Sequence, residues 1–373
     1  MRRIANFLTY LISYLIPINK KLLVFVSGFD YSDNPYAIYR YLLEHGMHNE
    51  YIFCWLVKDV VRSETNIKSD LKTLDCPARV LCLKRKSLKG IYLSFRARYI
   101  FNTTGLYRFI IYHQKDKRIN MWHGMPIKRI FTEGRNGDIT IATSELFAPL
   151  MSRGLNIPLE NVWIVGQPRN DLMFRKDLAQ FSFLNKKFKT VGIWMPTFRR
   201  TLVDNYQDGN YTDGYISFVN INELKDLNDI LVNNNSLLII KLHPLDVLQN
   251  KEIPSLSNIV VYKNNNFHNK DLYPLLGVCD YMLTDYSSVA IDYEILRRPI
   301  GFTLDNIEEY GKTRGLSIDT LPGKSLYTYD EMKNFILDAI NKNIETTDFG
   351  TTYNLYRDNN SSYRLLSKLR FIK

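Results

Sequence analysis

The sequence has little of what disulfide frameworks and metal sites require. It contains four cysteines in 373 residues, and none of them forms a C-x-x-C pair. Three of the four lie among apolar neighbours, which is typical of reduced, partly buried thiols and favours a cytoplasmic protein. There is also no H-E-x-x-H motif and no Asp-x-Asp pair to hold a nucleotide-bound divalent ion. We therefore expect neither a disulfide nor a metal.

The sequence also lacks an apolar run of the length that crosses a membrane. Residues 4–18 are apolar and rich in aromatics, but a span needs about 20 such residues and Pro17 interrupts this run. No small-residue cleavage site follows, so we do not expect a cleaved signal peptide. Basic residues flank the run on both sides, and no acidic residue precedes Asp30. We favour a helix over residues 1–19 at the interface of an anionic membrane; a helix packed on its own domain stays open.

Basic residues outnumber acidic ones, 49 against 38, which gives a net charge of +11. Such a surplus favours an anionic partner, which could be a membrane surface, a nucleotide, a phosphate polymer or nucleic acid. Charge alone does not choose among them. With 45% hydrophobic residues, a chain of this length can bury two cores and suits two domains.

Strand-like and helix-like segments alternate from residue 21 onward, which predicts parallel sheets covered by helices. The strands expected in the first half are 22–26, 51–57, 79–83, 99–102, 119–122, 139–143 and 162–165. Those expected in the second half are 190–195, 237–242, 259–262, 281–283 and 299–303. We expect an α/β fold with two doubly wound domains, at residues 20–184 and 185–352. Residues 353–373 are basic and helical in pattern, and we expect them to cross back to the first domain.

The stretch 280–296, DYMLTDYSSVAIDYEIL, has the pattern of a short strand, a polar turn and a helix. The first backbone N–H groups of a helix have no partner within it, and the helix dipole is positive there. Ser287 and Ser288 would add hydroxyl donors to such an anion site, next to Asp285. An ordinary helix cap explains this segment alone equally well.

Other predicted strands also end in polar, cationic or imidazole residues. His123, Arg169, Arg199 and His243 each follow the end of a predicted strand. Ligands of open parallel sheets bind beyond the carboxyl ends of the strands. Each residue alone has a common structural explanation, because a histidine after a strand is most often a hydrogen-bonding group. Together, at one edge of each sheet, they predict a site for an anionic ligand.

Six motifs occur in order along the chain. They are W-H-G-M-P-I-K at 122–128, G-Q-P-R-N-D at 166–171, M-P-T-F-R at 195–199, K-L-H-P at 241–244, L-T-D-Y-S-S-V-A-I-D-Y at 283–293, and R-G-L with L-P-G at 314–323. In order and spacing they resemble the CDP-glycerol glycerophosphotransferases of teichoic acid and capsule synthesis, from about residue 20 to the C-terminus. The sequence departs from that pattern at Met125, Met195, Phe198 and Asn359-Asn360, which leaves the exact donor open.

The resemblance implies a GT-B fold, in which two Rossmann-like domains face a cleft, with the acceptor near the first domain and the donor nucleotide on the second. It implies transfer of glycerol phosphate from CDP-glycerol to a hydroxyl of a lipid-linked or polymer acceptor, with release of CMP, at the cytoplasmic face of the membrane. It also implies a peripheral enzyme that needs no cofactor, no metal and no nucleic-acid partner. Short members of the family, which this chain resembles, include single-unit transferases as well as polymerases.

The resemblance also assigns roles to residues. His123 is the candidate general base, and His243 is the second catalytic candidate. The donor-phosphate candidates are Thr197, Arg199, Asp285, Ser287, Ser288 and Arg169. The acceptor-side candidates are Trp122, Gly124 and Lys128.

Other functions stay open. One is a ribitol phosphate transferase, and another is a GT-B glycosyltransferase that uses a different nucleotide-activated donor. From another class, the chain could be a membrane-bound polyanion-binding protein without turnover, in which the basic run 84–98 forms the binding face.

Overall fold

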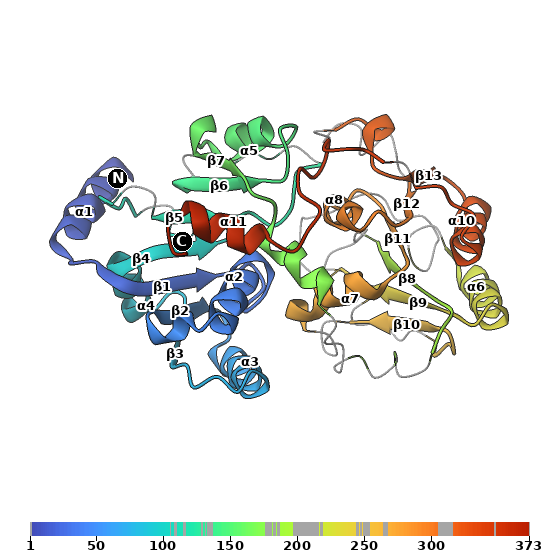
Figure 1. The fold of residues 1–373 in the computed structure, drawn as a ribbon, viewed down its shortest axis with the longest axis horizontal. Helices are drawn as coiled ribbons and strands as arrows, with labels where there is room; N and C mark the ends of the chain where they lie inside the picture. Colours follow the sequence, from blue (N-terminus) through green and yellow to red (C-terminus); the bar gives the residue numbers. More distant parts are fainter. Residues whose placement is uncertain are drawn as a thin grey trace. The chain divides into compact units, whose positions relative to one another are not determined.

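The computed structural model describes most of the chain (Figure 1). The described residues are 2–104, 106–107, 110–114, 117–127, 130, 132, 137–175, 181, 184, 187–196, 216, 219–243, 246, 248, 254–263, 268–304, 316–346 and 348–372. Two compact units divide the chain: unit 1 comprises Met1–Met125, Ile130–Leu172 and Asp358–Lys373, and unit 2 comprises Pro126–Arg129 and Met173–Arg357. The boundary after Leu172 falls within the 3-10 helix η3 (Pro168–Phe174), ahead of the linker predicted near residue 185.

Unit 1 is built on a seven-stranded sheet whose neighbouring strands are all parallel, in the order β3-β2-β1-β4-β5-β6-β7. Its strands are β1 (Asn19–Val26), β2 (Ile52–Val57), β3 (Val80–Lys84), β4 (Ala97–Asn102), β5 (Arg118–Asn120), β6 (Ile139–Ala142) and β7 (Val162–Ile164). The strand order reverses between β1 and β4, and at such a point the loops on either side diverge and leave room for a ligand.

Helices cover both faces of this sheet, so its central strands are apolar on both sides. The helices are α1 (Arg2–Leu15), α2 (Asp33–Glu44), α3 (Val60–Thr73), α4 (Leu88–Arg96), α5 (Ala148–Leu155) and α11 (Ser361–Lys368), with 3-10 helices η1 (Met47–Asn49) and η2 (Leu159–Asn161). On one face Phe25 stacks on Trp55 and Phe101, with ring centroids 5.4 and 5.5 Å apart. On the other face Val24 and Val26 pack with Phe95 of α4.

Unit 2 repeats the plan with a six-stranded parallel sheet in the order β10-β9-β8-β11-β12-β13. Its strands are β8 (Thr190–Met195), β9 (Ser236–Lys241), β10 (Ile259–Tyr262), β11 (Tyr281–Thr284), β12 (Ile300–Thr303) and β13 (Lys324–Leu326). Its helices are α6 (Ile221–Asn233), α7 (Leu272–Val278), α8 (Val289–Tyr293) and α10 (Tyr329–Asn341), with η6 (Asn269–Asp271), η7 (Glu294–Leu296) and η8 (Ile318–Thr320). The predicted α/β fold with two parallel sheets is confirmed.

Two helices of unit 2, α6 and α10, begin with the same kind of cap and cover the same face of its sheet. Each begins with a capping box, Asn220 with Glu223 and Thr328 with Glu331, in which each side chain bonds the backbone N–H of the other residue. Both helices pack into one buried cluster around Trp194 of β8. The sequence therefore sets where these helices begin, and their apolar faces close the core.

Helix α1 attaches to unit 1 through polar side chains. The Thr9 hydroxyl accepts a hydrogen bond from the Ile111 N–H at 3.1 Å, and the Ser13 hydroxyl accepts one from the His113 N–H at 2.8 Å. Ile16, just beyond the helix, packs against the core of unit 1. Among the described residues, no helix combines the length and the apolar character that crossing a membrane requires.

The C-terminal helix α11 belongs to unit 1 and lies beside α2 (Figure 1). The Asp171 carboxylate accepts hydrogen bonds from the Ser361 and Ser362 N–H groups at 2.9 and 2.8 Å, which satisfies two free donors at the start of the helix. Gly166, at φ +83°, lies so close that a Cβ there would meet the Ser361 hydroxyl oxygen at 2.5 Å. Asp171, which lies within η3, thus holds the start of α11.

We predict that Asp171→Ala lowers the free energy of unfolding by about 1–2 kcal/mol, because two N–H groups at the helix start lose their acceptor. Urea unfolding measures this loss. The control is Asp358→Ala, which removes a more exposed carboxylate that pairs with Arg364 near the same helix end. Equal losses in the two variants would contradict the role given to Asp171.

Candidate active site

His123 lies in a sharply turned loop beyond the carboxyl end of β5. The residues on both sides of it have left-handed backbone angles, with φ +54° at Trp122 and φ +140° at Gly124. Glycine adopts such angles freely, whereas for a tryptophan they are strained. The Trp122 N–H donates to the Asn120 side chain at 3.0 Å, and the indole lies 4.2 Å from the imidazole between ring centroids. The loop therefore holds the imidazole in a defined place.

The surroundings of His123 favour a neutral imidazole. Desolvation by the surrounding protein lowers its pKa from the ordinary 6.5, although the residue is still exposed to solvent. The Asp33 carboxylate and then the Thr103 carbonyl raise this pKa, and the Arg169 guanidinium, whose effect is the smallest, lowers it. The Nδ1 atom faces the Thr103 carbonyl oxygen at 3.5 Å. With its proton on that side, Nε2 presents a lone pair, and a neutral imidazole with a free Nε2 can accept a proton at neutral pH.

A buried amide connects three of the loops at this edge of unit 1. The Asn34 side chain, fully buried, donates to the Trp122 carbonyl at 3.2 Å and to the Gln167 side-chain oxygen at 2.9 Å. Its oxygen accepts from the Arg169 N–H at 3.1 Å. The loops after β1, β5 and β7 are thereby fixed to one another.

Arg169, which the resemblance places among the donor-phosphate candidates, is buried in unit 1. Its guanidinium donates to the Asp33 carboxylate at 2.8 Å. A phosphate contact for Arg169 therefore stays a prediction, and in this structure its charge is paired.

Neither Asp33 nor Asn34 was among the residues predicted from the sequence. They follow the predicted strand at 22–26, so the rule that found His123 and Arg169 at other strand ends points to them too. The sequence D-N-P at 33–35 is also typical of an ordinary helix start, so these two residues were not recognised as functional candidates.

At the corresponding edge of unit 2, hydrogen bonds join the ends of neighbouring strands. The Thr284 hydroxyl donates to the Met195 carbonyl at 2.8 Å, and the Thr303 hydroxyl donates to the Thr284 carbonyl at 3.2 Å. Asp285, the next residue along, is fully buried. Ser287 and Ser288 are half-buried and lead into α8, which has only five residues before it tightens into η7.

His243 lies at the same edge of unit 2, two residues after β9, and is half-buried. The last residue of β9 is Lys241, a buried lysine whose Nζ donates to the Leu242 carbonyl at 3.1 Å. Burial lowers the pKa of this amine to about 8. Lys241, the first residue of the K-L-H-P motif, is therefore a functional candidate that was not among the residues predicted from the sequence.

The predicted site residues thus gather in two groups. Trp122, His123, Gly124 and Arg169 lie together in unit 1. His243, Asp285, Ser287 and Ser288 lie at the carboxyl edge of the sheet in unit 2. Thr197, Arg199 and Lys128 lie outside the described residues. Within the part of the chain that the structure describes, no cluster of three or more His, Cys, Asp or Glu side chains could hold a metal ion.

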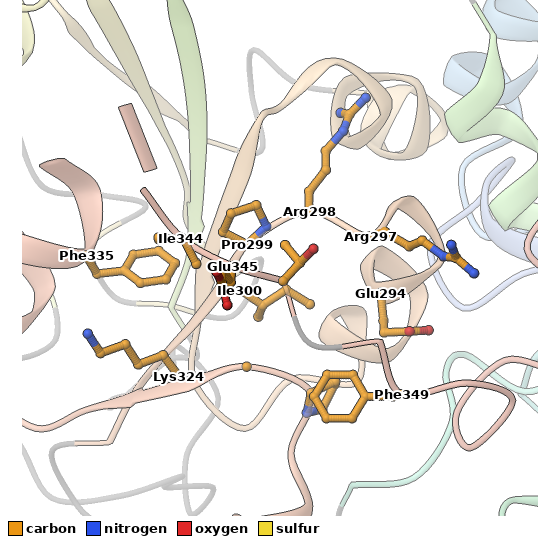
Figure 2. A pocket seen from close by; sticks show the side chains of 13 residues that line it. Glu294, Arg297, Arg298, Pro299, Ile300, Lys324, Phe335, Ile344, Glu345 and Phe349 are labelled. Carbon is orange, nitrogen blue, oxygen red and sulfur yellow. The ribbon is translucent and has the colours of Figure 1, made fainter. Parts of the chain in front are cut away.

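Unit 2 also has a cavity of about 210 Å³ at the other edge of its sheet (Figure 2). Ile300 at the start of β12, Lys324 at the start of β13 and Phe335 of α10 line it. Because β11, β12 and β13 run parallel, these starts lie away from Asp285 and the serine pair. None of the residues predicted for the site lines this cavity.

The profile of the family described as CDP-Glycerol:Poly(glycerophosphate) glycerophosphotransferase matches residues 8–370. The chain belongs to this family. The resemblance inferred from the six motifs is thus confirmed, and the match extends over nearly the whole chain.

Three curated relatives have related names. The teichoic acid poly(glycerol phosphate) polymerase of Bacillus spizizenii is 28% identical over 364 residues, which cover 88% of this chain and 85% of that protein. The teichoic acid glycerol-phosphate primase of Bacillus subtilis is 26% identical over 305 residues, 75% of each chain. The teichoic acid poly(ribitol-phosphate) polymerase of Bacillus spizizenii is 28% identical over 215 residues, which cover 54% of this chain and 32% of that protein.

Solved structures share the fold at low sequence identity. The wall teichoic acid polymerase TagF aligns with a TM-score of 0.71 at 19% identity, over 99% of this chain and 92% of that chain. The UDP-GlcNAc 2-epimerase from Neisseria meningitidis aligns with a TM-score of 0.51 at 13% identity, over 94% of this chain and all of that chain. These likenesses support the fold alone.

We predict that His123→Ala lowers turnover of CDP-glycerol by about 10²–10⁴-fold, because a general base acts on the acceptor proton. Donor affinity, measured by calorimetric titration, should stay within a few-fold, because the proton acceptor does not hold the nucleotide. His45→Ala, which changes an exposed histidine on the C-terminal side of α2, is the control. Near-normal turnover of His123→Ala would remove this histidine from the mechanism.

Proposed function

We propose that this protein transfers glycerol phosphate from CDP-glycerol to a hydroxyl of a lipid-linked acceptor and releases CMP, in teichoic acid or capsular polymer synthesis. Membership of the family supports the donor and the reaction, and TagF, a solved protein of this fold, has been studied as an H444N variant soaked with CDPG. The observation in this chain that carries the proposal is the imidazole of His123, held in a sharply turned loop at the carboxyl edge of its sheet and exposed to solvent.

In the proposed reaction, the acceptor hydroxyl gives its proton to Nε2 of His123 while its oxygen attacks the phosphorus that carries glycerol. The bond from that phosphorus to the bridging oxygen breaks, and CMP leaves with the bond's electron pair. Phosphoryl transfer needs positioning and positive charge around the phosphate oxygens more than covalent catalysis. We assign this role to His243, Ser287 and Ser288 of unit 2, together with Arg199.

We further propose that the two units work as a GT-B enzyme. Unit 1 would hold the acceptor beside His123, and unit 2 would hold the nucleotide at the ends of β9 and β11. The reversal of strand order next to β1 and next to β8 supports a ligand site in each unit.

The direct test follows nucleotide release with CDP-glycerol, CDP-ribitol and UDP-sugars, in the presence of a lipid-linked acceptor and excess EDTA. We expect CMP release from CDP-glycerol to exceed release from the other donors by at least about tenfold, and to persist in EDTA. Faster turnover of CDP-ribitol would support the ribitol alternative, which the ribitol-phosphate relative favours. Release of UDP, or of no nucleotide, would contradict the proposal.

We propose that the protein is a peripheral membrane protein on the cytoplasmic face. The exposed residues of α1 support this location. Seven large hydrophobic residues of this helix are between 42% and 81% exposed: Phe7, Leu8, Tyr10, Leu11, Ile12, Tyr14 and Leu15. Ser13, by contrast, is 2% exposed. An ordinary surface helix has the opposite arrangement, with its apolar face against the core. The exposed lysines at positions 20 and 21 add the charge that attracts an anionic lipid surface.

We predict that changing Leu8, Leu11 and Leu15 together to serine lowers binding to anionic vesicles by roughly tenfold or more, because exposed apolar area no longer enters the interface. Vesicle co-sedimentation measures the binding, and turnover of a soluble acceptor analogue should be unchanged. The control triple variant changes Val61, Leu159 and Val232, exposed apolar residues of other elements, to serine. Unchanged vesicle binding would argue against α1 as the contact, and lost folding would place the leucines in the core.

A further inference from the structure

The segment that leads from β1 into α2 contains two strained residues. Tyr31 and Asp33 have φ of +53° and +65°, angles that non-glycine residues rarely adopt. Such conformations persist only where the surrounding contacts enforce them, and they gather at functional sites. The Tyr31 hydroxyl donates to the Asp70 carboxylate at 3.0 Å. At Asp33 the contacts come from its own side chain and from Asn34, and these two residues begin α2.

Asn34 acts on the position of His123. Its amide donates to the carbonyl of Trp122, the residue directly before His123, and to Gln167 in the loop after β7. Because Asn34 is fully buried, an apolar side chain in its place would remove these hydrogen bonds from a site that water does not reach. The contact therefore holds the strained Trp122 backbone from which the imidazole projects.

Asp33 acts on the charge beside His123. One carboxylate oxygen, Oδ1, accepts hydrogen bonds from both the Arg169 guanidinium and the Asn34 N–H, each at 2.8 Å. Two charged groups act on the imidazole, Asp33 from α2 and Arg169 from η3. The Thr103 carbonyl after β4 acts on it through a hydrogen bond. Arg169 disfavours an imidazolium at His123, and the Asp33 anion offsets that effect.

We propose that Asp33 and Asn34 are positioning residues for the base of this enzyme, in which Asn34 fixes the backbone before His123 and Asp33 stabilises the imidazolium formed when His123 takes the acceptor proton. The inference rests on the proposed function, because it concerns a proton taken during that reaction. Neither residue transfers the proton or touches the phosphate.

The test uses Asp33→Asn in the full-length protein. This change keeps the shape and one acceptor for Arg169 but removes the negative charge. Turnover should fall about tenfold or more, and the acidic limb of the kcat/KM profile should move to lower pH, because an imidazolium without its anion loses its proton more readily. Donor affinity should stay within a few-fold. Glu44→Gln, which removes an ion-paired carboxylate at the other end of α2, should change none of these.

A second measurement does not depend on turnover. Diethyl pyrocarbonate reacts with neutral imidazole, so the pH at which His123 becomes modifiable, read by mass spectrometry of its peptide, reports the same pKa. We expect this midpoint to be lower in Asp33→Asn than in the unaltered protein and in Glu44→Gln. An unchanged or higher midpoint in Asp33→Asn would overturn the role of Asp33.

Asn34→Ala tests the other half of the proposal. We expect lower kcat with little change in the KM for the donor, and a pH midpoint that moves less than in Asp33→Asn. Normal kcat in a folded Asn34→Ala variant would overturn the role of Asn34, and if that variant does not fold, Asn34→Ser is measured in the same way. Failure of the proposed function would look different, because the unaltered protein would then release no CMP.

Discussion

The hydrogen bonds of the Asn34 side-chain amide join the start of α2 to the loops after β5 and β7, in which His123 and Arg169 lie. A buried amide must satisfy its donors and its acceptor, and this one does so only with the loops after β5 and β7 in their present places. The strain at Trp122 and Asp33 is then a consequence of that arrangement. A histidine that must meet a substrate hydroxyl needs such fixed support, because small displacements of a base cost large factors in rate.

At the carboxyl edge of its own sheet, unit 2 is held together by a different set of hydrogen bonds. Threonine hydroxyls tie the ends of β8, β11 and β12 together through backbone carbonyls, which leaves the following turn with Asp285 buried at its base. An anionic donor needs many weak positive contacts, and a turn of small polar residues suits that need. In the proposed reaction, unit 1 therefore positions the proton acceptor, and unit 2 neutralises the charge of the donor phosphates.

The fold was largely predictable because buried parallel strands are continuous apolar runs that alternate with amphipathic helices. The predicted strand at 119–122 was too long, since Trp122 turns out of the sheet with a positive φ and β5 ends at Asn120. β13 was not predicted, because three residues that begin with a lysine carry no strand pattern. An apolar run with basic residues on both sides predicted a helix where α1 lies, but such a run does not say which face of the helix meets the protein. Ser13, whose hydroxyl accepts a hydrogen bond from the His113 N–H, lies on that face.

For the site, the residues that follow each strand can be identified in the sequence, so His123 and His243 were predicted as candidates without a structure. The residues that hold the site in place through hydrogen bonds could not be predicted in this way. Asn34 is distant in sequence from Gln167, and only folding brings the two together. The resemblance made Arg169 a candidate phosphate contact, which stays a prediction, and its ion pair with Asp33 is visible only in the structure.

We expect His123 to carry a neutral imidazole with its proton on Nδ1, which leaves the lone pair of Nε2 for the acceptor proton. Nitrogen-15 NMR of the imidazole, titrated with pH in the full-length protein and assigned by comparison with His123→Gln, measures both properties at once. We predict a pKa below 6.5 for this imidazole and, above that pKa, the tautomer protonated at Nδ1. A pKa above 6.5, or a neutral form protonated at Nε2, would contradict it.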